Sequence, residues 1–241
     1  MPDEISAAAN EHGSRVRDMF ATIAARYDFL NHLLSGNMDK RWRRLVAKTL
    51  SEDLPSDECR ILDVACGTGD LALTLFETTG ASIVGSDFCR PMLDIAAHKA
   101  AERGAIPFVE GDALNLPFLA GSFDAATIAF GLRNLASVEG GLAELLRILR
   151  PGGRVAVLEF SQPVVPGFSL LFRLYFTKLL PLVGGLVSGS RRAYEYLPNS
   201  VSRFPNQEKL ADLMRQVGFD EVRYRNLTGG VAALHLGRRP S

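Results

Sequence analysis

The chain has 241 residues, its 27 lysines and arginines balance 27 aspartates and glutamates, and 47% of its residues are hydrophobic. This balance excludes a protein that holds nucleic acid by bulk positive charge, and it excludes a disordered chain. The length fits one large domain or one domain with an appendage.

The cysteines and the first residues bear on the cell compartment. The three cysteines, Cys59, Cys66 and Cys89, form no CxxC pair, so we expect neither a disulfide framework nor a metal at a zinc-type site. Residues 1–6 are acidic and no apolar run follows them, which argues against a secretory signal. No uninterrupted apolar stretch reaches the length of about 20 residues that spans a bilayer. The sequence therefore predicts a cytoplasmic protein.

The N-terminal part of the chain has a helical pattern. Residues 1–13 are polar and are expected to be frayed. Over residues 14–50, apolar side chains recur at three- and four-residue spacing, with a break over 27–37 that ends in turn residues. This pattern predicts a helical lid for the domain that follows.

From residue 60 the chain alternates between short apolar strands and helices. The predicted strands cover residues 61–66, 82–87, 107–110, 123–130 and 154–159. The predicted helices cover residues 67–78, 91–103 and 138–149. Arg150-Pro-Gly-Gly indicates a turn after the last of these helices. This alternation indicates βαβ units, and therefore a parallel sheet with helices on both faces.

The last third of the chain departs from this alternation. Residues 163–190 form an apolar insertion, and residues 206–217 are predicted as a further helix. The two final strands, 221–226 and 231–236, are joined by Thr-Gly-Gly, a link so short that it permits only an antiparallel pair. We therefore predict a single α/β domain over 1–241. It has a seven-stranded, Rossmann-like, mostly parallel sheet with an antiparallel last strand, an N-terminal helical lid and a helical insertion.

A glycine loop follows the first predicted strand. Asp63 lies in that strand, and Gly67 and Gly69 let the backbone turn tightly and let a ligand approach closely. The next helix offers free N–H groups, and Asp87 at the end of the second strand can accept hydrogen bonds from both hydroxyls of a ribose. This order of elements indicates a nucleoside-containing cofactor. Gly67-x-Gly69-x-x-Ala72 also fits the dinucleotide fingerprint, so an NAD-dependent oxidoreductase is an alternative.

Three features favour S-adenosylmethionine over NAD. Asp63 can face a cationic amino group, Gly111-Asp112-Ala113 suits the edge of an adenine ring, and the antiparallel final pair completes a seven-stranded sheet. From about residue 60 to its end, the chain resembles the class I methyltransferases. The resemblance implies S-adenosyl-L-methionine as the cofactor. It also implies these contacts: the methionine part with Asp63, Gly67, Thr68 and Gly69, the ribose with Asp87, and the adenine with Asp112 and Ala113.

Four separated motifs resemble one family of methyltransferases more closely. They are Tyr27-Asp-x-x-Asn31-x-x-x-Ser35 followed by Trp42-Arg, then residues 130–134, 147–163 and 226–237. Over about residues 15–238 the chain is similar to the ubiquinone and menaquinone biosynthesis C-methyltransferases. The resemblance implies methyl transfer to a ring carbon of a polyprenylated quinol, either demethylmenaquinol or 2-polyprenyl-6-methoxy-1,4-benzoquinol. The motifs do not decide between these two. A methyltransferase for another small molecule or lipid is an alternative.

The candidate catalytic residues follow from their positions. Arg133 and Asn134 come directly after the fourth strand, at the ligand-binding edge of the sheet. Arg133 can stabilise a developing phenolate and Asn134 can orient a hydroxyl; alternatively, Arg133 pairs with a carboxylate and Asn134 caps the next helix. Tyr27 lies where a lid could close over the cofactor, or it is a packing residue. His32 is the one histidine that we consider as a base.

The insertion carries the remaining signal. Residues 163–187 contain only two charged side chains, Arg173 and Lys178. The segment could lie in a bilayer interface and accommodate a polyprenyl tail, which would place the protein peripherally at the inner face of a membrane. It could equally be a buried cap over the sheet or the interface of a homodimer. The sequence leaves these interpretations open.

Overall fold

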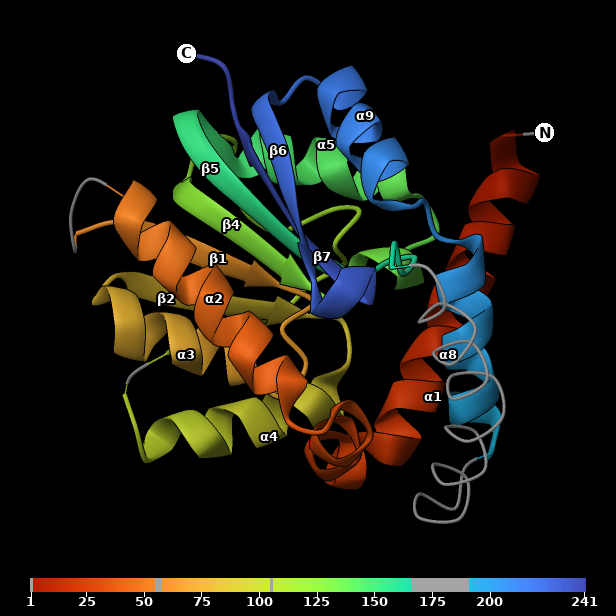
Figure 1. Cartoon of the computed structure of the whole chain (residues 1–241). Helices are drawn as coiled ribbons and strands as arrows, with labels where there is room; N and C mark the ends of the chain where they lie inside the picture. The colour runs from red at the N-terminus through yellow and green to blue at the C-terminus, as the bar shows by residue number, and fades with distance from the viewer. Residues whose placement is uncertain (1, 55–57, 105, 166–190) are drawn as a thin grey trace.

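One seven-stranded sheet organises the part of the chain that the computed structural model describes, residues 2–54, 58–104, 106–165 and 191–241 (Figure 1). Its strands are β1 (Arg60–Val64), β2 (Ser82–Asp87), β3 (Phe108–Glu110), β4 (Phe123–Ala129), β5 (Leu149–Phe160), β6 (Asp220–Leu227) and β7 (Ala232–Arg238). They are ordered β3-β2-β1-β4-β5-β7-β6. β7 is antiparallel to both of its neighbours and the other pairs are parallel. The predicted fold class is confirmed.

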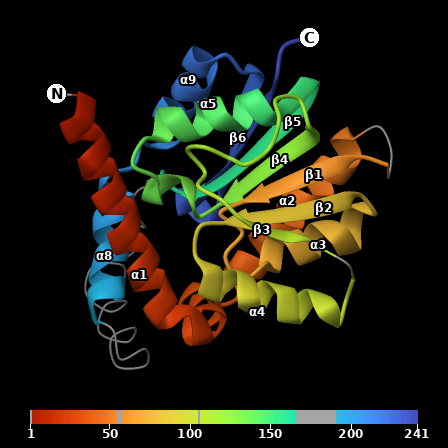
Figure 2. The same cartoon turned by 180° about the vertical axis from the view of Figure 1, so that it is seen from behind.

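Helices cover both faces of this sheet (Figures 1 and 2). One face carries α2 (Met38–Asp53), α3 (Asp70–Thr79) and α4 (Arg90–Ala101), and the other carries α5 (Val138–Ile148) and α9 (Gln207–Val217). Successive side chains of β1 enter different cores, since Ile61 packs with α2 and α3 whereas Leu62 packs on the side of α5 and α9. A strand buried on both faces needs an apolar side chain at nearly every position, which made this segment recognisable in the sequence.

The N-terminal helix is longer than the sequence pattern predicts. α1 runs without interruption from Pro2 to Ser35, and the chain turns only at Gly36 and Asn37, which both have positive φ angles (59° and 62°). The predictions of a frayed start and of a break from residue 27 are therefore wrong. Leu30 continues the buried spacing through the expected break. Proline and acidic residues in the first turn, followed by three alanines, favour a helix start despite the polar composition.

Three further differences concern the second half of the chain. α8 (Arg191–Arg203) was not predicted, and it lies beside α1 near the carboxyl ends of the parallel strands (Figures 1 and 2). β5 begins at Leu149 instead of residue 154, because Leu149 already pairs with Phe123 before the register shifts. Two short 3-10 helices, η1 (Leu132–Asn134) and η3 (Thr228–Gly230), form the links after β4 and β6. Most of the predicted insertion lies outside the described residues.

Candidate active site

The glycine loop after β1 has the backbone shape that the sequence predicts. Gly67 and Gly69 have φ angles of 55° and 81°, and Gly69 is the N-cap of α3. A Cβ atom on Gly69 would lie 3.0 Å from the Cβ of Ala96 and 3.2 Å from the ring of Phe108, so a larger residue does not fit there. A Cβ on Gly67 would meet only the ring of Tyr27, at 4.0 Å. Gly67 is therefore the glycine that faces open space.

Asp87 fixes this loop from the end of β2. Its buried carboxylate accepts hydrogen bonds from the backbone N–H groups of Gly67 and Cys89, both at 2.8 Å. Burial raises the pKa of Asp87, and these backbone hydrogen bonds oppose the rise. Each carboxylate oxygen has a second lone pair, so Asp87 can hold the loop and still accept a hydrogen bond from a ligand.

A cavity opens between the glycine loop, the end of β2, the segment after β3, and η1. We call it the loop cavity. It brings together six of the ten predicted site residues, namely Gly67, Asp87, Asp112, Ala113, Tyr27 and Asn134. The carboxylate of Asp112 accepts a hydrogen bond from the N–H of Leu114 (2.9 Å), which shapes the turn after β3. The residues predicted to contact ribose and adenine thus share one cavity.

Three predicted cofactor residues lie behind this cavity, outside its lining. Asp63 is only 1% exposed beneath the loop, where one carboxylate oxygen accepts a hydrogen bond from Thr127 (2.7 Å). The other oxygen, Oδ2, is buried and has no hydrogen-bond partner in the described part of the chain. Burial raises the pKa of Asp63 to about 7. Thr68 donates a hydrogen bond to Asp28 of α1 (2.5 Å), and Gly69 packs against α4 and β3.

A second cavity adjoins the first and lies under α1. We call it the lid cavity. It shares Phe20, Tyr27 and Phe130 with the loop cavity, so the two spaces meet at these three rings. Its other lining residues come from α1, α2, η1, the end of β5, and α8, and they are Met19, Ile23, Asn31, Ser35, Asp39, Trp42, Arg43, Arg133, Phe160, Tyr196 and Leu197. A mostly apolar space with a few polar side chains fits a small aromatic molecule.

Arg133 enters the lid cavity while it is anchored by a buried carboxylate. Its Nη1 donates hydrogen bonds to both oxygens of Glu159, at 3.0 and 3.1 Å, and Glu159 is 1% exposed. Glu159 also accepts the backbone N–H groups of Arg133 (3.2 Å) and Phe160 (3.0 Å). Arg133 Nε is buried and has no hydrogen-bond partner among the described residues. The pairing with a carboxylate that we considered is present, and it engages Nη1, which also donates a hydrogen bond to the carbonyl oxygen of Phe130.

Tyr27 lines both cavities, whereas Asn134 lines the loop cavity. Asn134 does not cap α5, because Ser137 does so by accepting the N–H of Gly140 (2.9 Å). Instead, Asn134 accepts a hydrogen bond from the hydroxyl of Tyr196 on α8 (3.1 Å). Burial raises the pKa of the Tyr27 phenol, an effect that Arg133 partly offsets. Tyr27 thus lies where the cavities meet, and Asn134 is hydrogen-bonded to a residue of the lid cavity.

The sequence analysis missed the polar cluster around Asp39. This buried carboxylate accepts hydrogen bonds from Ser35 (2.7 Å) and Arg43 (2.6 Å), and His32 Nδ1 lies 2.7 Å from it. Burial raises the pKa of Asp39, but Arg43 and these hydrogen bonds outweigh burial and lower it overall. His32 therefore touches the lid cavity only through Asp39. The i, i+4 spacing of Ser35, Asp39 and Arg43 was the available signal.

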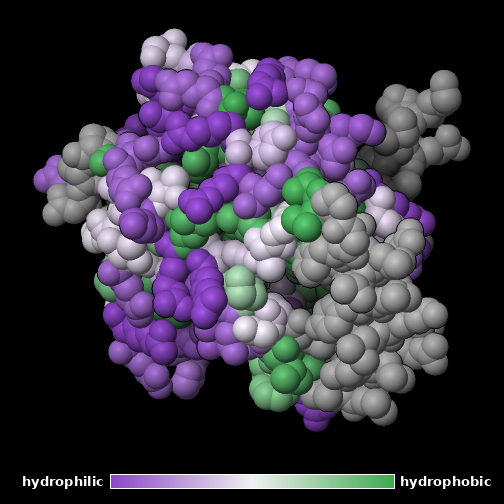
Figure 3. Space-filling model, viewed as in Figure 1, coloured by the Kyte–Doolittle hydropathy of each residue, from purple (hydrophilic) through white to green (hydrophobic). Residues whose placement is uncertain are grey.

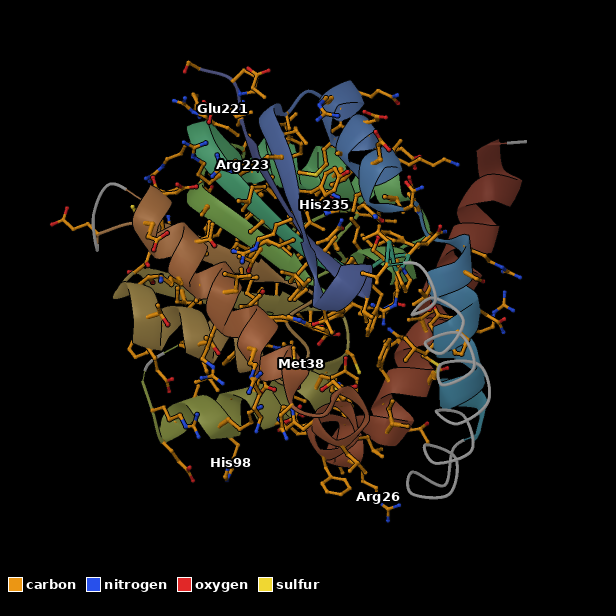
Figure 4. All side chains as sticks on the ribbon, in the orientation of Figure 1. Arg26, Met38, His98, Glu221, Arg223 and His235 are labelled. Atoms are coloured by element: carbon orange, nitrogen blue, oxygen red, sulfur yellow. The ribbon has the colours of Figure 1, made fainter. Side chains whose placement is uncertain are left out.

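Figure 4 shows the side chains in this arrangement, with Met38 at the start of α2 and His235 on β7. His235 is buried, and its Nε2 lies 2.7 Å from the carbonyl oxygen of Gln207, away from both cavities. Burial lowers its pKa to about 4. Across residues 2–54, 58–104, 106–165 and 191–241, no three His, Cys, Asp or Glu side chains are arranged to hold a metal ion.

Comparisons with known proteins agree with this geometry. The sequence model of the ubiE/COQ5 methyltransferase family matches residues 8–239. The chain is 54% identical to a demethylmenaquinone methyltransferase of Thermus thermophilus, over 92% of this chain and 100% of the relative. It is 45% identical to a ubiquinone/menaquinone biosynthesis C-methyltransferase of Citrifermentans bemidjiense, over 96% of this chain and 99% of the relative. Among solved structures, a SAM-dependent methyltransferase of Thermotoga maritima superposes with a TM-score of 0.64 at 22% sequence identity. The superposition covers 92% of this chain and 99% of that structure, and it supports the fold.

Proposed function

Because the chain belongs to the ubiE/COQ5 methyltransferase family, we propose that it methylates a ring carbon of demethylmenaquinol. It is a methyltransferase of quinone biosynthesis that uses S-adenosyl-L-methionine. The naphthoquinol is favoured because the relatives of Thermus and Deinococcus, at 54% and 51% identity, are both named for demethylmenaquinone. The benzoquinol is a second candidate, since a relative at 45% identity is named for both ubiquinone and menaquinone biosynthesis. The observation that carries the proposal is that two cavities meet at Tyr27 and Phe130.

The loop cavity suits S-adenosyl-L-methionine in charge and shape. Asp87 can accept the ribose hydroxyls, and Asp112 and Ala113 border the space left for the adenine. A buried carboxylate oxygen without a partner is unfavourable, so the unpaired Oδ2 of Asp63 supports an ammonium group bound nearby. The cofactor supplies an electrophilic methyl group on a sulfonium. The residues of this cavity then have to orient it toward the lid cavity.

The lid cavity supplies what methylation of a quinol carbon requires. The ring must be electron-rich, and loss of a hydroxyl proton makes it more so. The guanidinium of Arg133 lines this cavity and can stabilise the resulting phenolate, and Asn134, which lines the adjoining loop cavity, can orient the hydroxyl. The rings of Phe130 and Phe160, 4.7 Å apart between centroids, exclude water from one wall. Methyl transfer from the bound sulfonium would form the new C–C bond as the C–S bond breaks, and the ring carbon would then lose its proton to solvent.

The raised pKa of Asp63 makes cofactor binding depend on pH. Asp63 is mostly protonated below its pKa of about 7 and ionised above it, and only the ionised form attracts an ammonium group. The affinity for S-adenosylhomocysteine should therefore rise about tenfold between about pH 6 and pH 7.5. Calorimetric titration measures this dependence. Asp63→Asn, which keeps an acceptor for Thr127, should bind more weakly and lose the pH dependence; a variant that retains it would remove Asp63 from this role.

A methyl-transfer assay with labelled S-adenosyl-L-methionine tests the proposed function directly. Demethylmenaquinol and 2-polyprenyl-6-methoxy-1,4-benzoquinol should be offered separately under reducing conditions. We expect label in the naphthoquinol product. Label in the benzoquinol alone would contradict the choice of substrate, and label in neither would contradict the proposal. Titration with NADH provides the control for the oxidoreductase alternative.

The proposal also includes the extent of the domain, the role of residues 163–187, and homodimerisation. The matched family model spans nearly the whole chain, which supports one methyltransferase domain over 1–241 with the lid at 14–50. Membrane contact or tail binding by residues 163–187, and homodimerisation, concern residues that lie mostly outside the described part. No helix among the described residues is both long and apolar enough to cross a membrane.

A further inference from the structure

The C-terminal half of α1 has two different faces. Ile23, Tyr27, Asn31 and Ser35 follow one another at four-residue spacing and line the lid cavity. Arg26, Phe29 and Leu33 lie on the opposite side of the helix, since residues three and four apart share a face. Phe29 is 60% exposed and Leu33 is 50% exposed. Figure 3 shows hydrophobic surface at this lower edge of the molecule, where α1 ends.

Exposed cations flank these two apolar side chains. Arg26 extends from the same edge of the molecule (Figure 4), and Lys40 and Arg41 follow the Gly36–Asn37 turn in the first turn of α2. Lys40 and Arg41 form no ion pair with any described residue. The nearby carboxylates Asp28, Asp39 and Asp70 form their ion pairs with Lys99 and Arg43, and not with Lys40 or Arg41. We call Arg26, Phe29, Leu33, Lys40 and Arg41 the docking surface.

We propose that the docking surface binds the face of a bilayer that contains anionic phospholipids. Phe29 and Leu33 enter the interface, and Lys40 and Arg41 meet the phosphate groups. Two exposed apolar side chains are too small a patch for a stable protein interface, which buries about 800 Å² on each partner. They suffice for reversible attachment to a membrane when cations add to the attraction. Charge complementarity therefore favours a lipid surface over a protein.

The position of this surface gives it a consequence for the reaction. The same stretch of α1 touches the bilayer on one side and lines the lid cavity on the other, so docking brings that cavity to the membrane that holds a polyprenylated acceptor. This consequence, unlike the docking itself, rests on the proposed function. The docking surface includes none of residues 163–187, so its side chains can be replaced alone.

Sedimentation with vesicles tests the docking. We expect the full chain to bind vesicles of phosphatidylcholine with phosphatidylglycerol, to bind phosphatidylcholine alone weakly, and to dissociate as salt is raised. The variant Phe29→Glu/Leu33→Glu should bind at least about tenfold more weakly, and Arg41→Glu should reduce only the anionic component. Leu119→Glu is the matched control, because Leu119 is 83% exposed at a different loop.

Several outcomes would overturn the proposal. Unchanged vesicle binding by the double variant is one, and equal binding to neutral and anionic vesicles is another. A wild-type dimer that the double variant dissociates would assign the surface to a second copy of the chain. Circular dichroism should show that the variants remain folded.

Activity separates this inference from the proposed function. The double variant should methylate a short-tailed quinol in solution at the wild-type rate. On a long-tailed quinol embedded in vesicles, its rate should be at least about tenfold lower than that of the wild type. Vesicle binding without methylation of any quinol would contradict the proposed function alone. Equal rates on the embedded quinol would contradict the role of docking alone.

Discussion

Replacing Arg133 with methionine is expected to lower kcat for quinol methylation by about 100-fold, because a donor that stabilises a developing oxyanion contributes on that scale. Arg133 lines the lid cavity, and its guanidinium carries the charge that a phenolate needs. Arg133 does not line the loop cavity. The dissociation constant of S-adenosylhomocysteine should therefore stay nearly unchanged. Single-turnover methyl transfer and calorimetry, made on the same preparation, measure the two effects.

The anchor of Arg133 dictates the control for this experiment. Removing the guanidinium leaves Glu159 buried without its cation, which destabilises a protein by about 3–5 kcal/mol. The double variant Arg133→Met/Glu159→Gln removes both charges and should recover most of that loss in thermal unfolding. It should remain as slow as the single variant. A stable double variant with wild-type turnover would show that Arg133 only pairs with Glu159 and supports the fold.

The regular part of the fold was predictable because its determinants are local. Each parallel strand is a short apolar run, and Thr228-Gly-Gly is too short for anything but an antiparallel return. The path of α1 was predicted less well, since a polar helix start has no apolar spacing to reveal it. α8 contains Pro198, which is unfavourable inside a helix, and its contact with α1 joins segments far apart in the chain, so local sequence patterns do not reveal that contact.

In the candidate site, too, the residues that could be predicted are those whose role depends on the sequence next to them. The glycine loop and Asp87 lie at strand ends, and the ends of parallel strands meet at one edge of the sheet. Arg133 and Glu159 are 26 residues apart, and their pairing depends on β4 and β5 being neighbours in a particular register. The lid cavity needs α1, α2 and α8 in place together. Sequence motifs identify such residues without showing which cavity each one lines.

Asp87 should be the residue on which cofactor affinity depends most. Asp87→Ala removes charge-assisted hydrogen bonds to the ribose and also leaves the N–H groups of Gly67 and Cys89 without their acceptor. Each charge-assisted bond contributes about 1.5–3 kcal/mol, so the dissociation constant of S-adenosylhomocysteine should rise about 100-fold. Asp87→Asn keeps one acceptor oxygen for the loop, so its dissociation constant should lie between those of the wild type and of Asp87→Ala. Calorimetry on all three proteins gives the series.

Glu110 supplies the matched control, because it pairs in register with Asp87 on the neighbouring strand, yet it is exposed and does not line the loop cavity. Glu110→Ala changes the net charge of the same sheet edge by the same amount and should leave the affinity unchanged. If both alanine variants weaken binding equally, the effect comes from the electrostatic field at the strand ends. If neither does, Asp87 holds the glycine loop and does not contact the cofactor. The expected difference between the two carboxylates therefore tests a ribose contact separately from charge.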